Sequence, residues 1–314
     1  MELDEYENLS HEELIERIQT AKREKKAVLL VHNYQKLEIQ ALADFVGDSL
    51  GLSQEAAKTD ADLIEFCGVD FMAESAKIVN PEKTVLIPEK EARCPMAAMI
   101  TAESLRKMKT EHPKAIVVCY VNTTADVKAE SDICCTSSNV VNVIKSLGDR
   151  EIIFVPDKNL ASYAARETGA HIIPWDGHCY VHNDFTVDDV KNAKNKHPRA
   201  KLIVHPECPP EVIDEADYVT STSGMVTYVE QNQEEIRKTG VVIGTEIGLV
   251  QQLQKKNPDL EIYPLSEWAI CTQMKLNNLV KVAWSLENDE YQVELPDDIL
   301  KKARRSLERM LEVI

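Results

Sequence analysis

The 314-residue chain lacks an excess of basic charge, a long apolar run and the basic, apolar start of a secreted protein. Lysine and arginine number 36 against 53 aspartates and glutamates, which gives a formal net charge of −17. Such a surface repels the phosphates of nucleic acids and anionic membranes, so we expect neither as a partner. No segment reaches the roughly 20 apolar residues needed to span a bilayer. We therefore expect a soluble, cytoplasmic protein.

Glycine and local cysteine motifs are also scarce. Glycine contributes only 10 residues, and GDSLGL at 47–52 is too poor in it to be a phosphate loop or a dinucleotide fingerprint. No Cys-x-x-Cys pair occurs among the eight cysteines, which excludes a zinc ribbon or a local ferredoxin-type site. A disulfide framework is not expected in a cytoplasmic chain. Any metal site must therefore combine cysteines from distant segments.

What the chain does contain is a threefold repeat of strand-like openings. KAVLLVHNY from residue 26, KAIVVCYVN from 114 and AKLIVHPEC from 200 are short apolar runs that end in polar residues. Two further strand-like segments follow each opening, at 61–69 and 83–91, at 131–139 and 151–159, and at 216–224 and 240–248. Helical stretches lie between them. This alternation predicts an α/β fold, with three similar α/β/α units whose small parallel sheets surround a pseudo-threefold axis.

The repeat also predicts the domain boundaries. The first unit spans residues 1–112 and includes an N-terminal helix, which begins at a Ser-x-x-Glu capping box made by Ser10 and Glu13. The second unit spans 113–198 and the third 199–279. The C-terminal residues 280–314 are expected to pack back onto the first unit, through a helix with Leu300, Leu307, Met310 and Leu311 on one side.

One cysteine lies near the end of each unit: Cys94, Cys179 and Cys271. If the strand ends of the three units converge, three thiolates can hold one centre and leave a position open, as in an iron-sulfur cluster with a free iron or a catalytic zinc. The match is imperfect, because Cys94 follows the segment 83–91 almost directly, whereas a further helix and strand precede the other two. The alternative is that these cysteines are small apolar packing residues, as we expect for most of the other five. Cys208 stays open between the two roles.

Several separated motifs resemble the quinolinate synthase (NadA) family of de novo NAD biosynthesis. They are HNYQ at 32–35, ADFVGDSL at 43–50, FCGVDFMAESAKI at 66–78, CPMA at 94–97, YVNT at 120–123, CTSSN at 135–139, HPEC at 205–208 and TSTSGM at 220–225. The resemblance covers about residues 20–280. It implies a transferase that condenses iminoaspartate with dihydroxyacetone phosphate to give quinolinate, phosphate and water. It also implies a 4Fe-4S cluster held by Cys94, Cys179 and Cys271, with one open iron as Lewis acid.

The resemblance further implies the roles of individual residues. Glu207 is implied as the general base, with His32, Tyr34 and His182 as proton-transfer or positioning partners. Met274 is expected beside the cluster, and Arg93 departs from the small residue common before the first cysteine. Hydroxyls that precede helices can bind anionic substrates locally in an acidic protein. The implied substrate-binding residues are His32, Ser49, Tyr120, Asn122, Ser137, His205, Glu207, Ser221 and Thr222.

Two other functions fit the same residues. An iron-sulfur hydro-lyase acting on another hydroxy acid would use the same open iron, and a non-enzymatic cluster or zinc sensor would use the cysteines alone. The sensor leaves the polar side chains at the strand ends unexplained, although histidines and helix-capping hydroxyls are often purely structural. Because iminoaspartate hydrolyses readily, the enzyme that supplies it is an expected transient partner.

Overall fold

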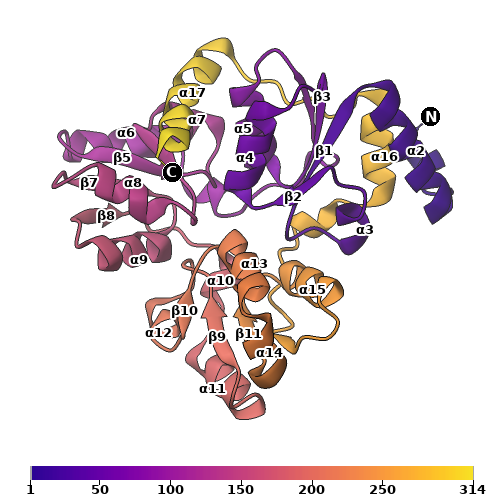
Figure 1. Cartoon of the computed structure of the whole chain (residues 1–314). Helices are drawn as coiled ribbons and strands as arrows, with labels where there is room; N and C mark the ends of the chain where they lie inside the picture. Colours follow the sequence, from indigo (N-terminus) through magenta and orange to yellow (C-terminus); the bar gives the residue numbers. More distant parts are fainter. Residues whose placement is uncertain (1, 314) are drawn as a thin grey trace. The chain divides into compact units, whose positions relative to one another are not determined.

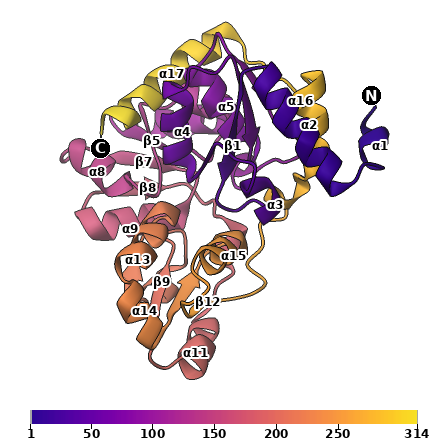
Figure 2. The same cartoon turned by 45° about the vertical axis from the view of Figure 1, so that its right-hand side comes forward.

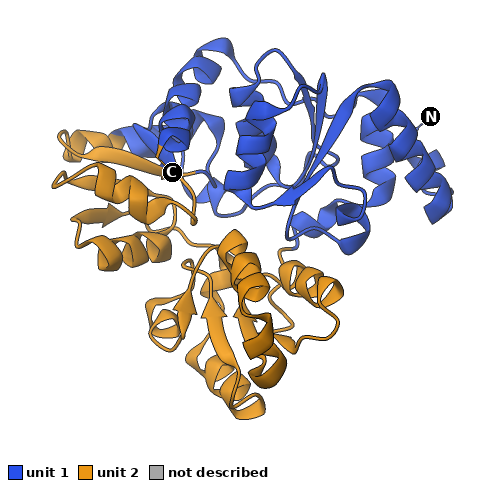
Figure 3. Ribbon diagram, in the orientation of Figure 1, with its two compact units in different colours: residues 1–106, 121–134, 272–312 blue, residues 107–120, 135–271, 313–314 orange. Residues whose placement is uncertain are grey.

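The computed structural model describes residues 2–313, which divide into two compact units (Figure 3). The first unit comprises residues 2–106, 121–134 and 272–312, and the second comprises 107–120, 135–271 and 313. Within the described residues, no helix has both the length and the apolar character needed to cross a membrane.

The first unit contains one complete sheet and the helices near both ends of the chain (Figure 1). Helix α6 (Ala102–Glu111) and strand β6 (Ile133–Cys135) each cross a boundary between the units. The other elements of the first unit are α1 (Leu3–Tyr6), α2 (His11–Glu24), β1 (Ala27–His32), α3 (Leu37–Gln40), β2 (Phe45–Gly47), α4 (Ser49–Lys58), β3 (Leu63–Cys67), α5 (Asp70–Val79), β4 (Thr84–Leu86), η1 (Ala97–Met99), α7 (Ala125–Ala129), η2 (Met274–Leu276), α16 (Leu279–Asn288) and α17 (Asp297–Glu312).

The second unit contains two runs of alternating strands and helices. Its elements are β5 (Ile116–Tyr120), α8 (Val140–Ser146), β7 (Ile152–Val155), α9 (Lys158–Thr168), β8 (Ile172–Pro174), α10 (Tyr180–Asn183), α11 (Val187–Lys196), β9 (Lys201–Val204), α12 (Pro210–Ile213), β10 (Tyr218–Val219), α13 (Thr222–Gln231), α14 (Gln233–Thr239), β11 (Val241–Gly244), α15 (Ile247–Lys256) and β12 (Ile262–Pro264).

Three four-stranded sheets share one topology. Their strand orders are β2-β1-β3-β4, β6-β5-β7-β8 and β10-β9-β11-β12. Every outer strand has only two or three residues, whereas the central strands have four to six. The predicted α/β class with three small parallel sheets is confirmed. The pseudo-threefold axis and the domain boundaries at 112 and 198 stay predictions.

The predicted equivalence of strands is wrong in the first of the three sequence repeats, residues 1–112. The segment 61–69 is β3, the third strand, and it matches β7 and β11 rather than β6 and β10. The true second strand, β2, is only three residues long and lies within ADFVGDSL, so no apolar run marks it. With β2 in place, Cys94, Cys179 and Cys271 each follow the fourth strand of a sheet, and the apparent irregularity at Cys94 disappears.

The central strands are buried because helices cover both faces of the sheets. In β1, Leu29 and Val31 pack with helices α2 and α16 in one core cluster. Leu30 of the same strand is also buried and points to the opposite face, because successive side chains alternate across a strand. Continuous apolar runs such as AVLLV therefore indicate parallel strands buried on both sides.

Helices α2 and α17 lie near the two ends of the chain. Helix α2 begins at the predicted capping box, in which Ser10 Oγ accepts from the Glu13 amide at 3.3 Å and Glu13 Oε2 accepts from the Ser10 amide at 2.8 Å. Helix α17 contacts α5 and α7, and Figure 2 shows it beside α5 from a second direction. On α17, Leu307 and Met310 are buried, and Leu300 and Leu311 are half-buried.

A candidate active site at the carboxyl ends of the strands

Residues of the predicted site end or follow the first strand of each sheet. In the strand order 2-1-3-4, the order in which strands are added to the sheet reverses between the first and third strands, and ligands of parallel sheets bind beyond the carboxyl ends at such a switch point. His32 ends β1 and Tyr34 follows it, Tyr120 ends β5 and Asn122 follows it, and His205 and Glu207 follow β9.

Hydroxyl groups follow the second strand of each sheet. Ser49 is the first residue of α4, Ser137 lies in the turn after β6, and Ser221 and Thr222 begin α13. Ser221 Oγ caps its helix by accepting from the Gly224 amide at 3.2 Å, and it also accepts a hydrogen bond from Ser138 Oγ at 2.9 Å. Ser138 was not singled out from the sequence, although it stands beside Ser137 in CTSSN.

Glu207 is the centre of a buried polar cluster in the second unit. Its Oε2 lies 2.6 Å from His182 Nδ1 and 3.6 Å from His205 Nδ1. The two imidazoles stack with their centroids 4.3 Å apart, and all three side chains are at most 3% exposed. His182 comes from the short helix α10 and Glu207 from the loop after β9, so the fold brings together residues that are 25 positions apart.

The two histidines determine the charge of Glu207. Burial alone would raise the pKa of its carboxyl group, but the positive character of His205 and His182, with hydrogen bonds from His182 and Tyr120, lowers that pKa to about 2. Oε1 of Glu207 is buried and has no hydrogen-bond partner within residues 2–313. The carboxylate is therefore ionised at neutral pH, and one of its oxygens has no hydrogen-bond partner among residues 2–313.

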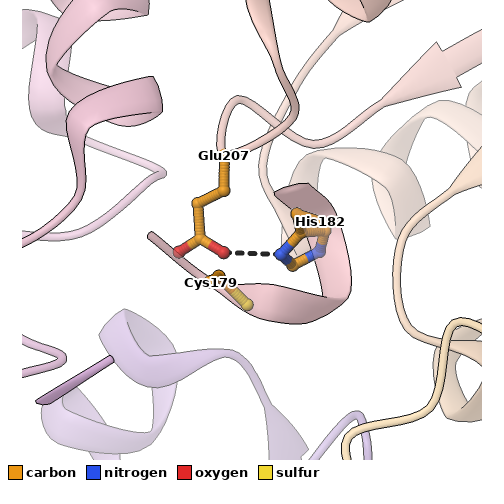
Figure 4. A group of neighbouring side chains, drawn as sticks. All are labelled: Cys179, His182 and Glu207. Carbon is orange, nitrogen blue, oxygen red and sulfur yellow. Dashed lines mark ion pairs between the residues drawn. The ribbon is translucent and has the colours of Figure 1, made fainter. Parts of the chain in front are cut away.

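Cys179 completes a three-residue group with His182 and Glu207, shown in Figure 4. Potential ligand atoms of the three side chains lie within 4.8 Å of one another. Two neighbours that the sequence did not reveal hold this group. Thr245 Oγ1 lies 2.9 Å from His182 Nε2, and Asn159 Nδ2 donates to the Glu207 carbonyl at 3.0 Å. Both follow the third strand of a sheet, a position that carries no motif of its own.

The eight cysteines, all within the described residues, differ in their accessibility. Cys94, Cys179 and Cys271 are half-buried, whereas the other five are buried. Burial raises the pKa of the Cys67, Cys135 and Cys208 thiols well above the ordinary value. Cys208 lies in the core cluster of the second unit, against which Cys179 and Cys271 also pack. Cys208 is thus a packing residue here, and the accessible thiols are the three predicted ligands.

The first unit contributes a second polar group. The His32 and Tyr34 rings meet edge to face at 4.6 Å, and His32 Nδ1 accepts from the Tyr34 amide at 3.1 Å. The same turn recurs at His205, whose Nδ1 accepts from the Glu207 amide at 3.3 Å. Asn122, also in this unit, has a buried Oδ1 with no hydrogen-bond partner among residues 2–313.

Met274 and Arg93 also belong to the first unit. Met274 is buried, with its sulfur 3.6 Å from Gln35 Nε2. Arg93 is exposed, and its guanidinium lies 3.5 Å from Glu91. Its charge is therefore directed to the surface of the loop that carries Cys94.

Comparison with known proteins gives a consistent result. The family model described as NadA, Quinolinate synthetase A protein, matches residues 16–312. A relative named quinolinate synthase from Methanoregula boonei is 52% identical over 298 residues, which cover 95% of this chain and 97% of the relative. The quinolinate synthases of Desulforudis audaxviator and Thermococcus onnurineus are 52% and 50% identical, over 96% of this chain and 98% and 99% of their own lengths. The chain therefore belongs to the quinolinate synthetase A family.

Proposed function

We propose that this protein is a quinolinate synthase, which condenses iminoaspartate with dihydroxyacetone phosphate to give quinolinate, phosphate and water in de novo NAD biosynthesis. The observation that carries this proposal is the identity of 50–52% to quinolinate synthases over almost the whole of both chains. The polar residues at the strand ends support it, because a condensation followed by dehydration requires groups that bind anions and move protons.

The three accessible cysteines are the proposed ligands of a 4Fe-4S cluster. Thiolates are the usual ligands of such clusters, and Cys94, Cys179 and Cys271 are the half-buried thiols, each after a fourth strand. The unpartnered Oε1 of Glu207 suits a site in which a bound ligand completes the hydrogen bonding. When bound, a cluster with three cysteine ligands supplies an open iron as a Lewis acid for hydroxyl or carboxylate groups of the substrate.

Proton transfer is assigned to Glu207 and the residues near it. The carboxylate is ionised, so it can accept a proton, and the 2.6 Å contact lets that proton pass to His182. Tyr34 and His32 are the proposed proton-transfer or positioning partners from the first unit. We assign the binding of substrate carboxylates and phosphate to His32, Ser49, Tyr120, Asn122, Ser137, His205, Glu207, Ser221 and Thr222. The enzyme that produces the labile imine is the proposed transient partner.

The first test is the iron and acid-labile sulfide content of anaerobically purified protein, together with quinolinate formation. We expect about four of each per chain in the parent and loss of both in Cys179→Ser. Cys67→Ala, which removes a buried cysteine, is the matched control and should keep the cluster. A parent that binds zinc, or that holds the cluster without forming quinolinate, would refute the proposed activity.

A further inference from the structure

The peptide N–H of each proposed ligand cysteine donates a hydrogen bond to an acidic side chain. The three donor and acceptor pairs are Cys94 to Asp70 Oδ1 at 3.1 Å, Cys179 to Asp157 Oδ2 at 3.0 Å and Cys271 to Glu246 Oε1 at 3.1 Å. Each acid follows the third strand of a sheet and begins or caps the next helix. Each cysteine follows the fourth strand, which lies beside the third.

A second hydrogen bond joins the same two loops in each case. The carbonyl two residues before the cysteine accepts from an amide at the helix start, at 2.8 Å every time. These bonds run from Asp70 to Ala92, from Lys158 to Gly177 and from Ile247 to Ala269. We call the two bonds together the clasp: the cysteine amide to the carboxylate, and the helix-start amide to the preceding carbonyl.

The carboxylates are engaged beyond the role of a simple helix cap. Asp157 Oδ1 accepts from the Leu160 amide at 2.7 Å, while its other oxygen, Oδ2, accepts from the Cys179 amide. Glu246 divides its two oxygens in the same way between Gly248, at 2.6 Å, and Cys271. Both acids are fully buried. A serine or threonine would cap the helix equally well, so capping alone does not require a carboxylate that reaches a second amide.

The chain around Cys179 is shaped to permit the clasp. A Cβ atom added to Gly177 would lie 2.4 Å from the carbonyl oxygen of Pro156, which is far inside van der Waals contact. Only glycine lets these two backbones approach, and their approach places the Cys179 amide against Asp157. The close approach at Gly177 and the hydrogen bond to Asp157 therefore both fix the position of the Cys179 backbone.

We propose that Asp70, Asp157 and Glu246 are positioning residues that hold the three cysteine loops in a ligand-ready conformation before iron binds. This inference rests on the proposed function, because it takes the three cysteines to be cluster ligands. Groups that orient metal ligands commonly change metal affinity or activity by about 10- to 100-fold when they are mutated. Because each acid bonds to the backbone rather than to sulfur, its role is to place the thiol.

Asp157 is the site for the decisive variants. Asp157→Ser keeps a hydroxyl that can cap α9 but is too short to reach Cys179. Asp157→Asn keeps the shape of the side chain but replaces one acceptor oxygen with an NH2 group. The side chain can then accept from only one of the Leu160 and Cys179 amides, because its NH2 group faces the other amide donor. The matched control is Asp176→Asn, which changes an exposed acid three residues before Cys179 whose partner is Lys158 at 2.9 Å. Asp70→Asn repeats the test in the first unit if the Asp157 variants do not fold.

Two measurements distinguish an effect on the clasp from an effect on cofactor binding. In cluster-free protein labelled with 15N-cysteine, the Cys179 amide signal, identified by its loss in Cys179→Ser, reports hydrogen exchange at the clasp itself. We expect exchange of this amide to be at least about 10-fold faster in Asp157→Ser and Asp157→Asn than in the parent and in Asp176→Asn. In reconstituted protein, we expect the half-time of iron loss to a chelator to fall about 10-fold or more, with a changed electron paramagnetic resonance signal of the reduced cluster.

The outcomes are distinguishable. Folded variants at Asp157 and Asp70 with parental amide exchange and parental iron retention would overturn the positioning role while leaving the proposed function intact. A parent that takes up no iron and sulfide would overturn the proposed cofactor, and faster amide exchange in the variants would then show the clasps to be structural only. Faster exchange with faster iron loss, and parental values in Asp176→Asn, would establish the proposal.

Discussion

Glu207 is ionised although it is buried, because two imidazoles lie against it. Glu207→Gln keeps the shape of the side chain but removes its charge and its ability to accept a proton. We expect the variant to retain iron and sulfide and to lose quinolinate formation by about 100-fold or more. Tyr34→Phe, which removes one hydroxyl, should also retain iron and sulfide and form quinolinate more slowly. Normal turnover in both variants would show that the proton chemistry belongs to other groups.

A second buried carboxyl group, Glu65 in β3, has the opposite environment. Burial raises the pKa of Glu65 well above the ordinary value. A hydrogen bond from Ser285 Oγ to its Oε2, at 3.4 Å, and the charge of Lys25 lower this pKa, whereas the charge of Asp289 raises it. The native state therefore keeps this proton to a higher pH than the unfolded state does. Above the ordinary pKa of glutamate the unfolded chain binds fewer protons, so the free energy of unfolding falls as pH rises toward the raised native pKa.

Glu65→Gln removes that dependence. We expect the variant to resemble the parent near pH 5 and to be more stable by about 1–3 kcal/mol near pH 8, because the unfolded parent has by then released a proton that the native state must either retain or lose to leave a poorly paired buried charge. Chemical denaturation at several pH values measures the difference, and Glu16→Gln, at an exposed position on α2, serves as the control. An advantage that does not grow with pH would show that Glu65 does not titrate in this range.

Single residues were predictable from the sequence when they belonged to a motif. Glu207 and His205 lie in the motif HPEC, whereas His182 was implied only by the family resemblance, and the structure brings the three together. Thr245 and Asn159 were not selected, because isolated threonines and asparagines are common at helix starts and their partners lie 63 and 48 positions away. The same holds for Asp70, Asp157 and Glu246, whose importance lies in a backbone amide that no side-chain pattern marks.

At the scale of elements, strand length decided what the sequence could predict. Central strands such as β1, β5 and β9 are continuous apolar runs and were recognised directly. Strand β2 has only the residues FVG, too few to show a period, and its omission shifted the equivalences within the first unit. The short edge strands gain their structure from pairing with a long neighbour rather than from their own propensity.

The conformation of the loop that carries Cys179 depends on Gly177, which packs directly against the Pro156 carbonyl. Gly177→Ala places a methyl group against the Pro156 carbonyl, so the loop must move away from the start of α9. We expect a lower melting temperature and faster loss of iron, whereas Gly51→Ala in α4, where an added methyl meets only ordinary contacts, should be neutral or slightly stabilising. Thermal unfolding and chelator kinetics measure both, and equal iron retention in the two variants would contradict a requirement for glycine at 177.

At the scale of the whole molecule, the eight cysteines divide into two classes. In cluster-free native protein we expect three thiols to react rapidly with a disulfide reagent, and the five buried ones only after unfolding. Cys179→Ser should lower the rapid count by one, and Cys67→Ala should leave it unchanged. Rapid reaction of more than three thiols in the native protein would mean that the five core cysteines are reached through local opening.

The family resemblance implied Cys94, Cys179 and Cys271 as cluster ligands, which stays a prediction, whereas composition and spacing alone left these cysteines between metal ligation and packing. The distinction depends on accessibility, which follows from where each sheet ends rather than from the residues next to the cysteine. Cys208 shows this: HPEC places it beside Glu207 in sequence, yet the strand direction turns it into the core.

Three small open sheets give residues 2–313 six outer strands, and exposed strand edges are sites at which other chains can add. In this protein those strands have only two or three residues, and β8 and β12 each end in a proline, which has no amide hydrogen to offer. The outer side of β4 is occupied by residues 291–293, which bond to Val85 and Ile87. A newly made chain therefore offers its neighbours few backbone groups for intermolecular β-pairing, which favours its survival against aggregation even while three of its thiols are still accessible.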